Sequence, residues 1–346
     1  TFILYYQGLN GSFYFDDNPN IVYNQAIQIN TLSSESIKSA LHSGHAGKLG
    51  RPIAMLSFAL NYYHSGLSPY YYKLTNLFIH LLSGIGLLLL SRQLLLSLPV
   101  KPNKNIILWV PLLAASLWLI HPLNLTTVLY IVQRMAGLSA LFCIWGMLCY
   151  VLGRLKINNQ KQYGWLLIAI SFFIFFPLAL YSKENAALFP IYCFLIEFFI
   201  FKFITPEKTQ QKILFTLYGI ILFIPLIIIL GKTVLSPQWL LSPYQYRDFT
   251  LSERIFTELR VIVFYLKSIL APVNSELGLN HDDFIISTSL FKPVSTFFAG
   301  LFIIFLLTLA FIVRHKQPIL SFGILFFFSA HLIESTIISL ELIHEH

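Results

Sequence analysis

Charged residues are scarce in this chain of 346 residues, of which only 11% are Asp, Glu, Lys or Arg. An ordinary soluble domain carries about 25% charged residues. A soluble protein this poor in charge could not cover its own surface, so the composition excludes one compact soluble domain. It also excludes a nucleic-acid-binding module, despite a formal net charge of +8.

Several other features are missing. The three cysteines, Cys143, Cys149 and Cys193, all lie in apolar stretches, which excludes a disulfide framework or a metal knuckle. The sequence shows no glycine-rich nucleotide loop, no zinc spacing, no serine nucleophile elbow and no internal repeat of 20–50 residues. It also lacks an initiator Met and opens in an apolar run, so we expect a segment to precede it.

Hydrophobic residues are abundant, at 56% of the chain with a mean hydropathy of +0.71. Apolar stretches of about 20 residues recur, and the alternating segments of a membrane barrel do not occur. We therefore predict an all-α, polytopic membrane protein that forms a single transmembrane domain over residues 1–346 with nine crossings. The first crossing is the stub Thr1–Tyr6, and the other eight are Tyr70–Ser91, Ile106–Ile120, Met135–Gly153, Gly164–Tyr181, Ala186–Phe201, Ile213–Gly231, Val294–Val313 and Pro318–Leu340.

Basic residues gather in four short loops, which follow the second, fourth, sixth and eighth predicted crossings. These loops hold eleven basic residues and one acid, Glu207. The positive-inside rule places them in the cytoplasm. Thirteen of the 15 acids fall on the opposite side, which favours a catalytic or binding face there.

The two long loops, residues 7–69 and 232–293, lie on that same outer side. Loops longer than about 15 residues tend to be functional. In the first loop we predict amphipathic helices at Ser34–His42, with Ser34 as the N-cap, and at Pro52–Tyr63. The apolar stretch Leu259–Leu270 contains Arg260 and Lys267, so we predict an interfacial or re-entrant helix rather than a crossing.

Two adjacent carboxylates, Asp16 and Asp17, follow the first predicted crossing by ten residues. A low-dielectric setting and a neighbouring like charge both raise the pKa of a carboxyl group, which suits a general base that deprotonates a hydroxyl. The alternative is a simple Asp-Asp-Asn-Pro turn in which the carboxylates cap the backbone.

Three cations, Arg51, Arg134 and Lys183, sit at the outer ends of predicted crossings. A fixed cation at headgroup depth can hold a lipid phosphate. The alternative for each is snorkelling or a local ion pair, such as Lys183 with Glu184. Three cations at matched depth favour an anionic lipid ligand.

Further acidic and histidine residues occur on the same side. His281, Asp282 and Asp283 are adjacent and could bind a metal ion, although a solvated turn is the favoured explanation, because adjacent residues rarely converge on one ion. The spacing of Glu334, Glu341 and Glu345 predicts one face of the last helix, with Glu334 inside the membrane.

These motifs together resemble a known family. An acidic pair in the first outer loop is typical of GT-C glycosyltransferases that use polyprenyl-phosphate sugars, and the chain resembles their transmembrane-and-tetratricopeptide-repeat O-mannosyltransferase group, in its bacterial branch. The resemblance covers essentially the whole chain. The matching strings are FDD at 15–17, GRPI at 50–53, SFALNY at 57–62, KLTNLFIHLL at 73–82, HP at 121–122, YIVQR at 130–134, SKE at 182–184, GLNHDDF at 278–284, ES at 334–335, LE at 340–341 and EH at 345–346.

The resemblance implies an inverting transfer of a sugar from a polyprenyl-phosphate donor to a protein or glycan hydroxyl, on the periplasmic face of a bacterial inner membrane. Asp16 would be the base, with Asp17 orienting it or sharing the role. Arg51, Arg134 and Lys183 would hold the phosphate. Further residues would line the cavity, namely Glu184, His121, His281, Asp282, Glu334 and Glu341.

Some expectations depart from the family or compete with it. The chain shows no tetratricopeptide repeats, so we expect a missing segment or a partner to supply acceptor recognition. No cofactor is required, and a divalent metal at Asp16, Asp17, His281 and Asp282 is the less favoured alternative. A transporter or flippase would use the same cavity, although internal repeats are typical of transporters. The third hypothesis is a non-catalytic membrane scaffold.

Overall fold

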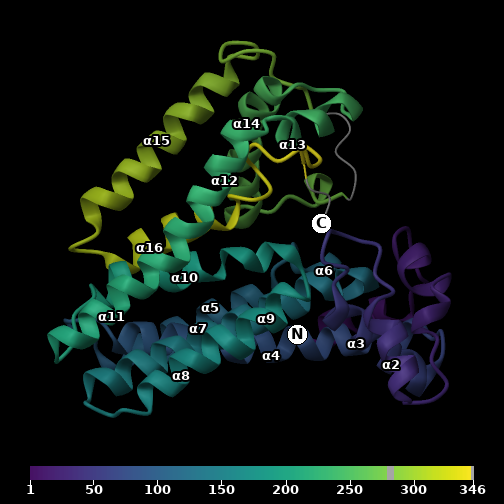
Figure 1. The fold of residues 1–346 in the computed structure, drawn as a ribbon, viewed down its shortest axis with the longest axis horizontal. Helices are drawn as coiled ribbons and strands as arrows, with labels where there is room; N and C mark the ends of the chain where they lie inside the picture. Colours follow the sequence, from purple (N-terminus) through teal and green to yellow (C-terminus); the bar gives the residue numbers. More distant parts are fainter. Residues whose placement is uncertain (279–283, 344–346) are drawn as a thin grey trace. The chain divides into compact units, whose positions relative to one another are not determined.

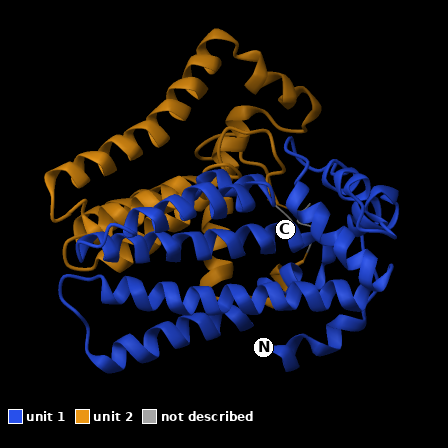
Figure 2. Ribbon diagram, turned by 60° about the horizontal axis from the view of Figure 1, so that its bottom comes forward, with its two compact units in different colours: residues 1–189 blue, residues 190–346 orange. Residues whose placement is uncertain are grey.

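The structure, a computed structural model, describes residues 1–278 and 284–343. These residues form helices joined by turns, without a β-strand (Figure 1), so the all-α prediction is confirmed. The helices group into two compact units, Thr1–Phe189 and Pro190–His346 (Figure 2). We describe each unit by itself, and the single transmembrane domain stays a prediction.

The first unit is built around helix α4 (Pro69–Leu96), which packs against α5 (Lys104–Ile120) and α7 (Arg134–Asn158). Pro69 occupies the first turn of α4. Backbone N–H groups in this turn have no partner within the helix, so a Pro residue there costs no hydrogen bond. The side chain of Asn103 caps α5 by accepting a hydrogen bond from the N–H of Ile106 at 2.9 Å. These caps and the long apolar runs between them account for the helical bundle.

Helix α7 also packs against α8 (Gly164–Ile170). The chain then passes through a π-helical turn, η5 (Ser171–Phe175), into α9 (Phe176–Leu180). Pro177 lies in the first turn of α9. Because Pro lacks an N–H, a backbone carbonyl in the preceding turn loses its usual hydrogen-bond donor. Loss of such a hydrogen bond is a recognised cause of irregular helical turns.

The segment before α4 contains short helices, of which α3 contacts α7. Ser33, not Ser34, is the N-cap of helix α2, and its hydroxyl accepts a hydrogen bond from the N–H of Ser36 at 3.1 Å. The helix predicted at Pro52–Tyr63 is confirmed as α3. The elements of this segment and of the link to α7 are α1 (Phe2–Tyr6), η1 (Gln7–Asn10), η2 (Asn18–Val22), η3 (Gln25–Ile27), α2 (Ser34–Leu41), α3 (Pro52–Ser65), α6 (Asn124–Leu129) and η4 (Ile131–Gln133).

The second unit holds the remaining helices. Its amphipathic helix α14 (Leu251–Leu270) extends the predicted interfacial helix by eight residues toward its N-terminus, because Thr250 and Glu253 form a capping box there. The other elements from residue 184 onward are η6 (Glu184–Leu188, in the first unit), α10 (Phe189–Ile196), η7 (Glu197–Phe201), α11 (Lys208–Tyr218), η8 (Gly219–Phe223), α12 (Ile224–Leu235), α13 (Gln238–Leu241), η9 (Ser242–Tyr246), η10 (Asn274–Glu276), α15 (Ser295–Val313) and α16 (Pro318–Ala330).

Five helical stretches among the described residues are long and apolar enough to cross a membrane, and α14 is not one of them. Three shorter apolar helices accompany them, and all eight fall where a crossing is predicted. The total of nine crossings stays a prediction. The five long stretches are Pro69–Leu96, Ile131–Asn158, Glu184–Phe201, Lys208–Leu235 and Ser295–Val313, and the shorter ones are Lys104–Ile120, Gly164–Leu180 and Pro318–Ala330.

The last predicted crossing, Pro318–Leu340, is wrong in its second half. Helix α16 ends at Ala330, and the described residues after it form turns. Glu334 and Glu341 therefore do not share a helix face. The cause is a set of hydrogen bonds to Arg254, described below.

Candidate active site around the start of helix α7

The carboxylate of Asp17 is buried against the start of helix α7. One oxygen accepts a hydrogen bond from the N–H of Val132 at 2.7 Å, and the other accepts one from the N–H of Tyr14 at 3.0 Å. Only 1% of Asp17 is exposed. Because helix starts leave N–H groups without helical partners and carry partial positive charge, a carboxylate is stabilised there.

Burial raises the pKa of Asp17 to about 6, although hydrogen bonds from Tyr14, Val132 and Ile131 and the charge of Lys73 act to lower it. The folded protein thus holds this proton more tightly than an ordinary carboxyl group does. The stability contributed by Asp17 therefore falls as the pH rises from about 4 to about 6. Asp17 fits a structural anion that fixes its loop.

Asp16 is the more exposed member of the pair, at the same turn. Its N–H donates a hydrogen bond to the hydroxyl of Tyr130 at 3.0 Å, and its carbonyl accepts one from the side chain of Asn20 at 2.9 Å. The side chain of Asp16 also hydrogen-bonds to Tyr130, whose own pKa is raised, mainly by burial. Asp16 is partly exposed, whereas Asp17 is buried.

Lys73 is a site residue that the sequence predictions omit. Its ammonium group donates hydrogen bonds to the carbonyls of Gly11 at 2.9 Å and Gly8 at 3.3 Å, and it interacts electrostatically with Asp17. It is buried inside the bundle on α4. A lysine close to the start of the predicted crossing Tyr70–Ser91 is the signal that could have identified it, because an unpaired charge that becomes buried there is costly.

Arg134 is fully buried on the first turn of α7. Its guanidinium donates hydrogen bonds to the side-chain oxygen of Asn76 at 2.7 Å, to the carbonyl of Tyr72 at 2.8 Å and to the carbonyl of Ser57 at 3.0 Å. It also lies over the ring of Phe58, 4.7 Å from its centroid. These contacts join α3, α4 and α7, so the structure gives Arg134 a scaffolding role, and its contact with phosphate stays a prediction.

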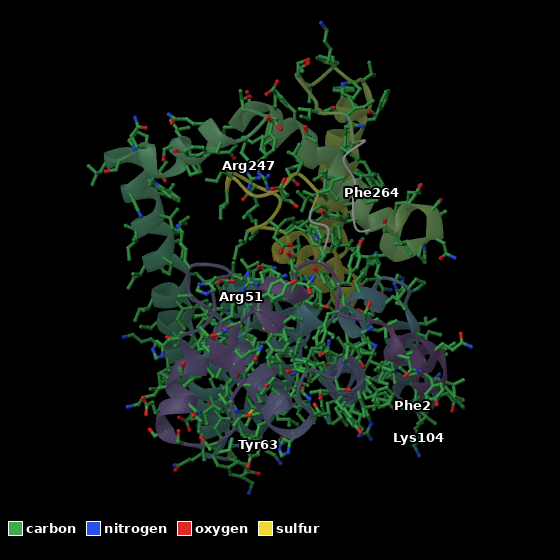
Figure 3. The ribbon with its side chains drawn as sticks, turned by 90° about the vertical axis from the view of Figure 1, so that its right-hand side faces the viewer. Phe2, Arg51, Tyr63, Lys104, Arg247 and Phe264 are labelled. Carbon is green, nitrogen blue, oxygen red and sulfur yellow. The ribbon has the colours of Figure 1, made fainter. Side chains whose placement is uncertain are left out.

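Arg51 and Glu184 form an ion pair close to the first turn of α7 (Figure 3 labels Arg51). The Arg51 Nε lies 2.9 Å from the Glu184 carboxylate, and a terminal nitrogen contacts the sulfur of Met135 at 3.1 Å. About a fifth of the Arg51 side chain is exposed, at 20%. Arg51 is thus more accessible than Arg134, and it has left-handed backbone geometry, with φ of 49°.

Two other predicted residues lie in the first unit. Lys183 is buried just before η6. His121 follows α5, and its Nδ1 accepts a hydrogen bond from the N–H of Leu123 at 3.3 Å. Their roles in phosphate binding and in lining the site stay predictions.

A cavity of about 230 Å³ lies between helices α4, α5, α6 and α7. Arg134 and Asn76 contribute to its wall, together with His80 and Trp118, whose rings lie 4.6 Å apart. The cavity therefore borders the residues that hold the start of α7, and its polar lining can accept water or a small polar group.

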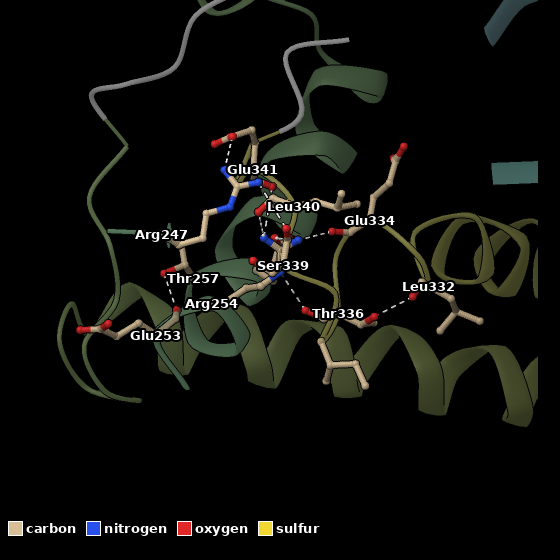
Figure 4. A network of polar contacts seen from close by, with 12 residues as sticks. Arg247, Glu253, Arg254, Thr257, Leu332, Glu334, Thr336, Ser339, Leu340 and Glu341 are labelled. Atoms are coloured by element: carbon tan, nitrogen blue, oxygen red, sulfur yellow. Dashed lines mark hydrogen bonds and ion pairs between the residues drawn. The ribbon is translucent and has the colours of Figure 1, made fainter. Parts of the chain in front are cut away.

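Glu334 and Glu341 belong to a separate network in the second unit (Figure 4). The guanidinium of Arg254 donates hydrogen bonds to the carbonyls of Glu334, Thr336, Leu340 and Glu341. The Glu341 side chain pairs with Arg247. Because Arg254 binds these carbonyls, the backbone after Ala330 forms turns around it instead of a helix.

Arg254 also lies 3.0 Å from a carboxylate oxygen of Glu258, one turn further along α14. Both side chains are buried. Burial raises the pKa of Glu258 to about 8, against the lowering effect of the Arg254 charge. The cluster is explained by its structural role in holding the turn segment.

His281 and Asp282 lie outside the described residues. Within 1–278 and 284–343, no group of three or more His, Cys, Asp or Glu side chains is arranged to hold a metal ion.

Comparison with known proteins finds relatives that are named protein O-mannosyl-transferases. No family model and no solved structure matches the chain. It is 29% identical to Protein O-mannosyl-transferase Tmtc1 of Drosophila melanogaster over 191 residues, which cover 54% of this chain and 20% of the relative. It is 29% identical to human Protein O-mannosyl-transferase TMTC4 over 188 residues, covering 49% and 24%.

Human Protein O-mannosyl-transferase TMTC3 is 25% identical over 194 residues, covering 55% of this chain and 20% of that protein. The chain thus aligns with only a fifth to a quarter of these relatives' length. The bacterial branch stays a prediction. In sequence the chain resembles the TMTC protein O-mannosyl-transferases, as its motifs predict.

Proposed function

We propose that this protein is a membrane glycosyltransferase that transfers a sugar from a polyprenyl-phosphate donor to a hydroxyl group of a protein or glycan. The observation that carries the proposal is the division between Asp16 and Asp17, in which a buried carboxylate fixes the loop and the adjacent one stays accessible. The similarity to relatives named as O-mannosyl-transferases supports the same function.

In the proposed step Asp16 accepts the proton of the acceptor hydroxyl. The hydroxyl oxygen forms a bond to the anomeric carbon while the bond from that carbon to the phosphate oxygen breaks. The polyprenyl phosphate leaves with the electron pair, and the anomeric centre inverts. A single displacement needs one base, whereas a glycosidase needs two carboxyl groups.

Tyr130 would keep Asp16 in place through its hydrogen bonds to that residue. Among the predicted phosphate ligands, Arg51 is the one we favour, because it is more accessible than the buried Arg134 and Lys183. Only a single phosphate group leaves, with less negative charge than a diphosphate carries, so the proposed step does not oblige a divalent metal. We place the Asp16 side of the protein outside the cytoplasm, on the evidence of the basic loops.

The test is sugar transfer by the purified full chain in proteoliposomes, with polyprenyl-phosphate mannose as donor and a Ser/Thr peptide as acceptor. We expect Asp16→Asn to lower kcat by about 100-fold or more, as for loss of a general base. Glu35→Gln, at an exposed acid of α2, is the matched control and should leave kcat unchanged.

Full activity in Asp16→Asn would refute the assignment of the base. Transbilayer movement of the lipid-linked sugar without any transfer would support the transporter instead. A chain that shows neither activity would fit the scaffold hypothesis.

A further inference from the structure

The turn that carries Asp16 holds a bulky residue in a strained conformation. Phe15 has φ of 44°, in the left-handed region that aromatic residues rarely occupy. Two backbone bonds close the turn, from the N–H of Asp17 to the carbonyl of Tyr14 at 2.9 Å and from the N–H of Asn18 to the carbonyl of Phe15 at 3.1 Å. Strain of this kind persists only where the surroundings impose it, and it concentrates at functional sites.

The surroundings do impose it here. Asp17 accepts a hydrogen bond from the N–H of Tyr14 and another from Val132. The N–H of Asp16 is held by the hydroxyl of Tyr130. The turn is therefore anchored to the residues before α7 through Asp16 and Asp17, and Tyr14 is held in turn by the side chain of Asp17.

The result is a pair of exposed aromatic rings beside the accessible carboxylate. Tyr14 is 60% exposed and Phe15 is 59% exposed. Their ring centroids lie 6.2 Å apart with planes 32° apart, and the ring of Tyr130 meets Tyr14 edge-on at 6.4 Å. We call Tyr14 and Phe15 the aromatic pair.

We propose that the aromatic pair is a stacking subsite for a hexose ring next to Asp16, an inference that rests on the proposed function. A pyranose presents C–H groups on its faces and hydroxyl groups at its rim. An aromatic face, which carries partial negative charge, attracts the C–H groups, and a neighbouring carboxylate accepts hydrogen bonds from the hydroxyls. The hexose can belong to the lipid-linked donor or to a glycan acceptor.

Insertion of the aromatic pair into lipid is the competing explanation, and two observations disfavour it. Asp16 is the residue directly after Phe15, and a carboxylate is costly to move into the hydrocarbon region. Membrane anchoring also needs no fixed backbone, whereas stacking beside a catalytic base requires the ring to hold one position.

Three substitutions of Phe15 distinguish the effect of its aromatic ring from the effect of the turn conformation. Phe15→Gly removes the ring and suits the left-handed backbone, Phe15→Leu keeps apolar bulk without a π face, and Phe15→Trp keeps an aromatic face. Tyr63→Leu, at an exposed aromatic of α3, is the matched control. We expect a roughly 3- to 10-fold rise in KM for Phe15→Gly and Phe15→Leu, the size of one aromatic contact, with kcat little changed. Phe15→Trp should raise KM less than Phe15→Gly and Phe15→Leu do, and the Tyr63→Leu control should behave as the unsubstituted protein.

A binding measurement makes the result independent of turnover. The probe is methyl α-D-mannopyranoside, observed by saturation-transfer difference NMR on the full chain in nanodiscs. Binding should weaken in Phe15→Gly and Phe15→Leu, whereas Asp16→Asn, whose amide oxygen still accepts a hydrogen bond from a sugar hydroxyl, should retain detectable binding. Inhibition by this glycoside that is competitive with the donor assigns the subsite to the donor sugar, and inhibition competitive with the acceptor assigns it to a glycan acceptor.

Unchanged KM and unchanged glycoside binding in Phe15→Gly and Phe15→Leu would overturn the proposal, even if transfer activity itself is established. Quenching of the added Phe15→Trp emission by brominated phospholipids, with no response to the glycoside, would overturn it in favour of lipid insertion. Glycoside binding that depends on Phe15 in a chain without transfer activity would support the subsite and refute only the proposed function.

Discussion

Asp16 and Asp17 differ in environment although they are neighbours in sequence. Asp17 faces the N–H groups that open α7, and Asp16 faces Tyr130 and remains partly accessible. The sequence predicts the pair and its chemistry, but it leaves their division of roles open. The division depends on contacts with residues 130–132, which are more than a hundred positions away in the chain.

The interaction of Lys73 with Asp17 predicts a measurable pH dependence of the transfer rate. Asp17 has a pKa of about 6, and the nearby Lys73 charge lowers it, while Arg134, Asp16 and Tyr130 are the other ionisable groups around it. As the pH falls through about 6, Asp17 gains a proton, which removes the negative charge beside the proposed base Asp16, so transfer should decline on the acid side. Lys73→Met removes a positive charge, so this decline should move to higher pH by about one unit.

The measurement is a pH–rate profile of transfer in proteoliposomes. Lys73→Arg keeps the charge and should keep the midpoint of the acidic decline. Lys48→Met, at an exposed lysine of the same segment, is the matched control. An unshifted midpoint in Lys73→Met, with activity retained, would show that Lys73 does not tune Asp17.

At the scale of helices and loops, apolar runs identify the helices well but locate their ends poorly. The run at 318–340 reads as one crossing, yet α16 ends at Ala330. What ends it is Arg254, about 80 residues earlier, which binds the carbonyl of Glu334 and others near it. Local sequence carries no sign of such a distant donor. The start of α2 shows a smaller error of the same kind, because the sequence allows either Ser33 or Ser34 to be its N-cap.

The contact of α7 with α8 gives a prediction for these elements. A Cβ on Gly164 would lie 2.6 Å from the carbonyl oxygen of Gly153, and a Cβ on Gly153 would lie 2.8 Å from that of Gly164. Both distances are too short, and backbone atoms cannot move aside as a flexible side chain can. We expect Gly164→Ala to lower the free energy of unfolding by about 1–3 kcal/mol, as overpacking does.

Thermal unfolding of the purified protein in detergent measures this cost. Gly323→Ala in α16 is the matched control, because a Cβ there meets no atom within 4 Å. It should keep or raise the unfolding temperature, since Ala favours helix over Gly. Equal unfolding temperatures for Gly164→Ala and the unsubstituted protein would show that α7 and α8 can move apart without loss of stability.

At the scale of the whole chain, composition predicts an all-helical membrane protein, and the structure places its apolar helices where the sequence does. The motif strings predict the resemblance to the TMTC proteins. Long-range contacts are the part that the sequence leaves open. Arg134 shows this, because its position at a helix start suggests a phosphate ligand, while its hydrogen bonds to Asn76, Ser57 and Tyr72 give it a scaffolding role.

The basic loops predict which side of the membrane carries Asp16. The loops around residues 154–161 and 314–316 are rich in Lys and Arg, which predicts that they lie in the cytoplasm. Ser12, near Asp16, should therefore lie on the opposite side from Gln162 and Gln317. Variants with one added cysteine at each of these exposed positions can be treated with a membrane-impermeant maleimide in sealed vesicles of known orientation. Ser252→Cys, at the start of α14, should react from the same side as Ser12→Cys.

The chain suits this experiment, because Cys143 and Cys193 are buried and only the partly exposed Cys149 needs replacement by Ser. In right-side-out vesicles we expect Ser12→Cys and Ser252→Cys to react at once, and Gln162→Cys and Gln317→Cys to react only after the membrane is opened. Reaction of all four from one side would refute the predicted topology. It would then place Asp16 in the same compartment as the basic loops, where a lipid-linked sugar of the outer leaflet cannot reach it.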